Sequence, residues 1–217
     1  MKNITALLIV LSGFAFSVQA QEPLSSYGTW KDSASHYIIQ LKGGALLVRL
    51  HSRAEAISKL RGVGSEQQAT LIENIQREEN KQIVEAFRSN FSFCKVYFFF
   101  ADSTDVLLSG KHSGFLLNDS LQVDHGLSMK DNFFMIAEKG NPHLRVKNDP
   151  TQPNQQQAER SYLNETIVLL DDHLKPLKAP FPFYAQEPFP TSLGTSNWKE
   201  KVRILNARLH SFYKKSL

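Results

Sequence analysis

Polar groups that could bind or transform a small molecule follow two apolar segments of this sequence, residues 45–50 and 94–101. They are His51, Ser52, Arg53, Asp102, Ser103 and Thr104. Open α/β sheets bind ligands beyond the carboxyl ends of their parallel strands, and helix N-termini favour anions. The six residues are therefore the candidate ligand-binding site. The alternative is that they only cap helices and contact solvent.

Asp102 and Asp105 could also form a pair of catalytic carboxylates. Haloacid-dehalogenase-type phosphatases use two aspartates two positions apart, one as nucleophile and one as acid/base. Here the spacing is three, so the second carboxylate would point elsewhere. Helix capping explains Asp102 better, because acidic residues favour the first turn of a helix. We therefore assign no catalytic residue.

Cys94 is the only cysteine in the chain, which excludes an intramolecular disulfide, a CxxC redox pair and a cysteine-built zinc site. It lies inside an apolar segment, as a buried small hydrophobe does, and is not expected to be a nucleophile.

Metal and phosphate motifs are also lacking. Residues 171–173 (Asp-Asp-His) and 124–125 (Asp-His) have the side chains of metal ligands. Both fall in predicted turns, where aspartates bond the backbone, and no HxxxH or HExxH partner follows. The GxxxxGK[ST] phosphate loop and the GxSxG elbow are absent. We expect neither a metal nor a cofactor.

Composition indicates one globular domain. The chain has 217 residues, of which 41% are hydrophobic and 21% are charged, a size typical of one domain or two small ones. Its net charge of +4 is too small to favour nucleic-acid binding, which needs a concentrated basic surface.

The first 20 residues have the layout of a secretory signal peptide. Lys2 is followed by an apolar run over 6–16 and by a small residue, Ala20, before the polar segment begins. The run is shorter than the ~20 residues of a membrane span, although an uncleaved anchor helix is the alternative. We predict an exported protein, periplasmic or secreted, with a soluble mature chain over 21–217 and no stable membrane insertion.

The first half of the mature chain predicts a strand–helix–strand unit. Residues 36–41 fit a strand or a short helix, with the helix slightly favoured. Residues 45–51 predict a strand. Ser52 and Ser65 are predicted to cap helices over 53–60 and 66–89. The polar middle of the second helix, 76–82, is interpreted as solvated.

Residues 91–102 are the most aromatic stretch. They predict a central strand over 94–101, covered on both faces and parallel to the first strand. Asp102, Ser103 and Thr104 would cap a short helix over 105–108.

The second half predicts antiparallel strands and a final helix. Residues 115–123 fit a hairpin or short strand with a turn at Asn118, and 132–137 and 165–170 fit strands, the latter followed by a turn at Asp171. Residues 147–161 lack apolar periodicity, which predicts a mobile loop. Asn197 is predicted to cap the final helix, with Glu200 completing a capping box.

The order of elements predicts a layered α/β domain with a mixed sheet, parallel in its first half and antiparallel in its second. It can be fitted to the βαβαββα order of a thioredoxin-like core. That fit rests on topology alone, and without a redox motif no redox function is implied.

Five of the nine prolines lie between Pro176 and Pro190, interleaved with aromatic residues. This extended segment, 176–190, could bind a protein partner, because preformed extended segments bind at low entropic cost. The favoured interpretation is that its aromatic residues cover an open face of the sheet.

Three stretches, 44–50, 91–99 and 170–184, resemble the uncharacterised exported proteins common in Bacteroidetes-type bacteria. The resemblance implies a compartment and no activity. We therefore expect an exported, non-enzymatic binding or structural module. The alternative is a hydrolase or transferase that acts on a small anionic substrate at the strand ends.

Overall fold

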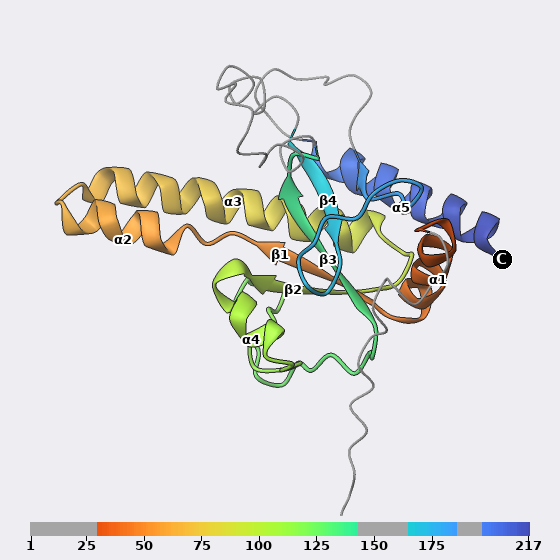
Figure 1. The fold of residues 1–217 in the computed structure, drawn as a ribbon. Helices are drawn as coiled ribbons and strands as arrows, with labels where there is room; N and C mark the ends of the chain where they lie inside the picture. Colours follow the sequence, from red (N-terminus) through yellow and green to blue (C-terminus); the bar gives the residue numbers. More distant parts are fainter. Residues whose placement is uncertain (1–29, 143–164, 186–196) are drawn as a thin grey trace, which may run out of the picture.

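A computed structural model describes residues 30–142, 165–185 and 197–217 (Figure 1). The predicted signal peptide at 1–20, the predicted loop at 147–161 and residues 186–190 of the Pro/Phe-rich segment lie outside the described residues.

A mixed sheet forms the middle of the fold and confirms the predicted α/β class. Its strands are β1 (Ala45–Leu50), β2 (Lys95–Phe100), β3 (Phe134–Gly140), β4 (Thr166–Leu170) and β5 (Tyr184–Ala185). In the described part of the chain their order is β2-β1-β3-β4-β5. β1 pairs parallel with β2 and with β3, whereas β4 and β5 continue the sheet antiparallel.

The aromatic strand β2 is at an edge of the sheet, so its predicted central position is wrong. β1 instead lies between two parallel neighbours, and its residues 45–48 are buried. The outer edge of β2 is partly covered, because Leu117 N donates to Phe98 O at 2.8 Å and Phe99 forms a bridge with Leu116. This cover explains why Phe98 and Phe99 are buried in an edge strand.

Three helices cover one face of the sheet: α1 (Trp30–Gly43), α3 (Glu66–Asn90) and α5 (Trp198–Ser216). α1 settles the ambiguity of residues 36–41 in favour of a helix. It buries Ala34, Tyr37, Ile38 and Leu41, a spacing that places all four on one side. At Gly44 the chain passes so close to Phe133 that an added Cβ would lie 2.3 Å from its carbonyl oxygen.

The other face is covered by the turn Ala101–Ser103 (η2), the short helix α4 (Thr104–Leu108) and the connection to β3. A turn at Asn118 is confirmed, because its side-chain Oδ1 accepts from the backbone N–H groups of Ser120 and Gln122. Phe115 packs edge-on to Phe99 with ring centroids 5.8 Å apart. The domain thus has three layers.

The Pro/Phe-rich segment packs on the domain over its described part, 176–185. Leu177 and Phe181 are buried in the core that contains α5, as the favoured interpretation predicted. The predicted cap of α5 is confirmed as well, because Asn197 Oδ1 accepts from Glu200 N at 3.2 Å.

α2 (Ala54–Gly62) and α3 form a helical hairpin that extends away from the sheet (Figure 1). Its turn uses Gly64 at φ +77°, a conformation that glycine adopts without strain. Ser52 was predicted as the N-cap of α2, but Arg53 occupies that position in the left-handed conformation, φ 54°. Ser65 precedes α3 without a capping side-chain bond.

Candidate functional site

The ends of β1 and β2 lie side by side, as the candidate site requires. Ser52 Oγ donates a hydrogen bond to Asp102 Oδ2 and accepts one from Ala54 N at 3.1 Å. Asp102 is therefore engaged by Ser52 and does not cap α4, whose N-cap position is Ser103, without a side-chain bond. The predicted cap thus falls on Ser103 by position, but its side chain makes no capping hydrogen bond and Asp102 does not cap the helix.

Thr104 and Arg49 connect the strand ends beneath that contact. Thr104 Oγ1 donates to Ala101 O at 2.5 Å and accepts from Arg49 Nε at 3.0 Å. Arg49 Nη1 also donates to Glu138 Oε2 at 2.9 Å, and the Glu138 side chain is only 4% exposed. Arg49 and Glu138 are partners in the register of β1 and β3. The buried carboxylate of Glu138 thus belongs to an ion pair with Arg49. The sequence analysis did not predict this pair.

His51 is half-buried next to these charges. Burial lowers the pKa of its imidazole below the ordinary 6.5; Glu138 opposes this, and Arg49, Lys139 and Arg53 reinforce it. The side chain is therefore neutral at pH 7, so it can exchange hydrogen bonds with a ligand but adds no positive charge.

The side chain of Arg53 bonds to α3. Its Nε donates to Gln76 Oε1 at 2.7 Å, and Gln76 Nε2 donates to Asn80 Oδ1 at 3.2 Å. Gln76 and Asn80 are buried, so the prediction of a solvated middle for α3 is wrong at these two positions. They lie on the same side of the helix as the buried Ala69 and Ile83.

Lys139 connects β3 to α3 on the side of the sheet opposite to its neighbour Glu138. Its Nζ lies 2.7 Å from Glu79 Oε1 and 3.0 Å from Glu165 Oε2. Burial lowers the pKa of Lys139, but the hydrogen bonds to the two glutamates raise it more, so the net shift is upward. The amine stays protonated, and its positive charge balances the negative charges of Glu79 and Glu165.

Four of the six predicted residues therefore bond to the protein itself through their side chains. Ser52 and Asp102 contact each other, Arg53 binds α3, and Thr104 binds Arg49. Within residues 30–142, 165–185 and 197–217, no group of three or more His, Cys, Asp or Glu side chains could hold a metal ion. The arrangement offers a neutral imidazole and a hydrogen-bonded Ser–Asp pair to a ligand.

The other candidate groups have structural roles in this fold. Burial raises the pKa of the Cys94 thiol to about 12, which keeps it protonated and unreactive at neutral pH. Asp171 Oδ1 accepts from His173 N at 2.9 Å and from Lys175 N at 2.7 Å, the turn role that its sequence context predicts. Burial raises the pKa of the neighbouring Asp172.

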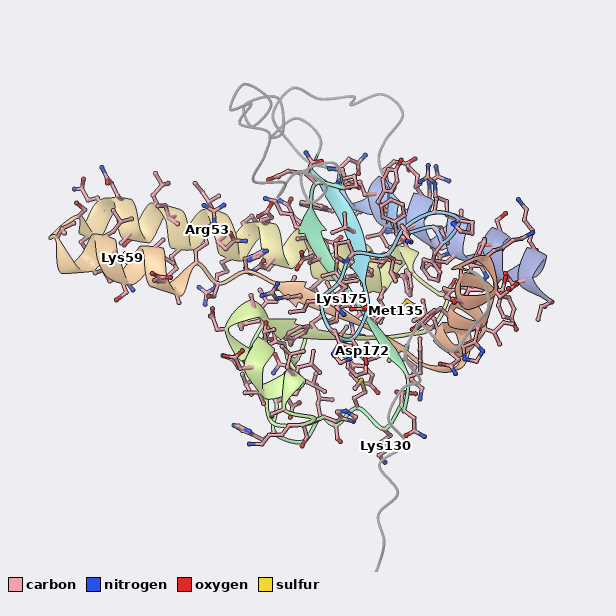
Figure 2. All side chains as sticks on the ribbon, viewed as in Figure 1. Arg53, Lys59, Lys130, Met135, Asp172 and Lys175 are labelled. Atoms are coloured by element: carbon pink, nitrogen blue, oxygen red, sulfur yellow. The ribbon has the colours of Figure 1, made fainter. Side chains whose placement is uncertain are left out.

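A second candidate site is the outer surface of the hairpin. We define the hairpin patch as Val63, Leu71 and Ile75, whose exposures are 76%, 60% and 60%. Figure 2 places Arg53 where the hairpin leaves the sheet and Lys59 farther out along α2. Large apolar side chains gathered on a projecting element mark interaction surfaces.

No family model, curated protein or solved structure matches this chain. Membership of a Bacteroidetes-type exported family and a thioredoxin-like topology therefore stay predictions. Among the described helices, none has the length and apolar character needed to cross a membrane.

Proposed function

We propose that this chain is an exported, non-enzymatic module that binds a protein through the hairpin patch. The observation that carries this proposal is the exposure of Val63, Leu71 and Ile75 on a helical hairpin that extends beyond the sheet. Export is inferred from the signal-peptide layout of residues 1–20.

The hairpin has features that a binding element needs. Ile57 and Ala69 are buried where α2 and α3 pack together, and Gln76 and Asn80 bond its base to the body. The patch is therefore held on a supported helix, and little conformational entropy is lost when it binds.

The strand ends support a non-enzymatic role. A hydrolase that uses a serine requires a base within hydrogen-bond reach of the hydroxyl. Ser52 Oγ bonds to the exposed carboxylate of Asp102 and to the backbone N–H of Ala54, and neither of these partners is an imidazole.

Site-specific photo-crosslinking in producing cells tests the proposal. A photoreactive amino acid at Leu71 should give a discrete crosslinked protein product in the exported fraction. The same probe at Leu108, a 48% exposed leucine of α4, is the matched control and should give none. Equal yields at the two positions would count against the hairpin as the binding element, and retention of the protein in the cytoplasm would remove the export part.

A second candidate, action on a small anionic substrate at the strand ends, is favoured by one observation: Ser52 and Asp102 lie in contact beside the half-buried His51. Titration with inorganic phosphate, followed by the NMR signals of the His51 ring, tests it. Saturable shifts that disappear in Arg53→Gln would support this site. Unchanged shifts at millimolar phosphate would leave the hairpin as the only candidate.

A further inference from the structure

We infer that the partner of the hairpin patch is the same patch on a second copy of this chain, with the two α3 helices packed antiparallel. This inference rests on the proposed function, because it names the occupant of the surface proposed there. Four features of α2 and α3 lead to it: the position of the apolar side chains, the charge balance, the two-fold complementarity and the space along the helix.

The apolar side chains lie opposite the face that α3 buries. Ala69, Gln76 and Ile83 lie on the buried face of α3, which packs on α2 near Ala69 and on the core at Ile83. Leu71 and Ile75 are four residues apart and therefore neighbours on one face, and at 100° per residue that face lies on the far side of the helix. Both side chains are 60% exposed, so the fold itself does not use them.

The charged side chains of α2 are paired within the hairpin. Lys59 pairs with Glu55, and Arg61 pairs with Glu66 and Glu73, at 2.5 to 3.1 Å. The patch therefore lacks the concentrated charge with which nucleic acid or an anionic membrane is bound. An apolar protein surface is the chemistry that fits.

The surroundings of the patch are complementary to themselves under a two-fold axis. If the axis passes between Leu71 and Ile75, then Leu71 packs on Ile75 of the second copy. The exposed Gln68 then faces the exposed Glu78 of the second copy, and a side-chain amide can donate to a carboxylate. A parallel arrangement would instead place Glu78 against Glu78, which is repulsive.

The length of the hairpin suits this arrangement. Gly64 at the tip and Gln82 at the body lie equally far along the chain from the centre of the patch, about 14 Å at the helical rise per residue. Beyond Gln82, Ile83 is already part of the main core. The tip of one copy can therefore reach the body of the other without overlapping it.

The patch is small for a stable dimer. Its exposed apolar side chains cover far less than a standard interface, which buries about 800 Å² on each partner. Since association also costs translational and rotational freedom, we expect a dissociation constant roughly in the micromolar range.

Sedimentation velocity on the purified protein between 1 and 200 µM is the first test. The wild type should change from monomer to dimer, and L71E/I75E should stay monomeric over the range. The matched control, L108E/V123E, changes two other exposed apolar residues, of 48% and 43% exposure, and should dimerise as the wild type does. Circular dichroism checks that all three proteins are folded. A wild type that is monomeric at 200 µM overturns the inference.

Disulfide trapping tests the orientation in a C94A background. A mixture of Q68C and E78C proteins should form a mixed disulfide dimer, whereas neither protein alone should. E78C dimers in the absence of Q68C would contradict the antiparallel packing.

The inference and the proposed function can fail separately. A monomeric wild type whose Leu71 probe still crosslinks to a different protein removes only the inference. A monomeric wild type with no Leu71-specific product removes both.

Discussion

Asn80 Nδ2 donates a hydrogen bond to the backbone carbonyl of His51 at 2.7 Å, and this contact joins the middle of α3 to the end of β1. Asn80 is 3% exposed, and its removal leaves the carbonyl of the half-buried His51 and the amide of the buried Gln76 without this partner. We expect Asn80→Ala to lower the free energy of unfolding by about 1–3 kcal/mol. Urea denaturation measures the change. Asn74→Ala, at an exposed position of the same helix, should stay within about 0.5 kcal/mol of the wild type.

The Arg49–Glu138 ion pair predicts non-additive substitutions. Arg49→Met leaves the carboxylate of Glu138 buried without its guanidinium partner, and we expect a loss of about 3–5 kcal/mol in the free energy of unfolding. Arg49→Met combined with Glu138→Leu removes both charges and should recover most of that loss. A double-mutant cycle by urea denaturation tests this, and additive losses would show that the pair is not coupled.

Thr166 predicts a stabilising substitution. Its side chain is fully buried, and in the described part of the chain its Oγ1 lacks a hydrogen-bond partner. Thr166→Val removes an unsatisfied hydroxyl at nearly constant volume, so the free energy of unfolding should stay unchanged or rise by about 1 kcal/mol. Thr104→Val is the comparison. It breaks the bonds with Ala101 and Arg49 and should cost about 1–3 kcal/mol.

His51 predicts a decrease in stability at mildly acid pH. Burial lowers its pKa from 6.5 in the folded state, so the unfolded chain binds a proton at a higher pH than the folded protein does. The free energy of unfolding should therefore fall as pH decreases from about 6.5 towards the folded pKa. Thermal melts between pH 7.5 and 5 measure this, and His51→Gln should reduce the slope of stability against pH.

The pKa of His210 is also lowered by burial. The slope that remains in His51→Gln should therefore decrease further when His210→Gln is added. An unchanged slope in His51→Gln would contradict the assignment.

Cys94 should be inert towards thiol reagents in the folded protein. Its thiol, with a pKa of about 12, forms very little thiolate at pH 8, and the thiolate is the reactive species. Labelling with an aromatic disulfide reagent should be at least about 100-fold slower in the native protein than in urea, where the pKa returns towards its ordinary value. Fast native labelling would show that Cys94 is accessible and ionised.

The positions of the strands could be predicted from the sequence because local apolar composition determines them. The aliphatic run at 45–50 and the aromatic run at 95–100 both form strands, and Asn118 and Asp171 form the turns that their side chains favour. The order of strands could not be predicted in the same way. Nothing in the composition of β2 distinguishes an edge strand covered by residues 116–117 from a central strand.

The polar core positions were missed for a different reason. Gln76 and Asn80 continue the buried stripe of Ala69 and Ile83 at helical spacing, so the signal was present in their positions, although their polarity suggested solvent. The Arg49–Glu138 pair had no local signal, because its partners are joined only through the register of β1 and β3.

The segment that covers β2 also protects the protein against aggregation. Lys-Val-Tyr-Phe-Phe-Phe is a strongly β-forming sequence, and an uncovered edge with such side chains invites pairing with other chains. The backbone N–H of Leu117 donates to the carbonyl oxygen of Phe98. The β-bridge between Phe99 and Leu116 pairs a further position of this edge. Loss of this cover, by deletion of residues 115–117, would turn the most aromatic strand of the sheet into a template for intermolecular β-sheet.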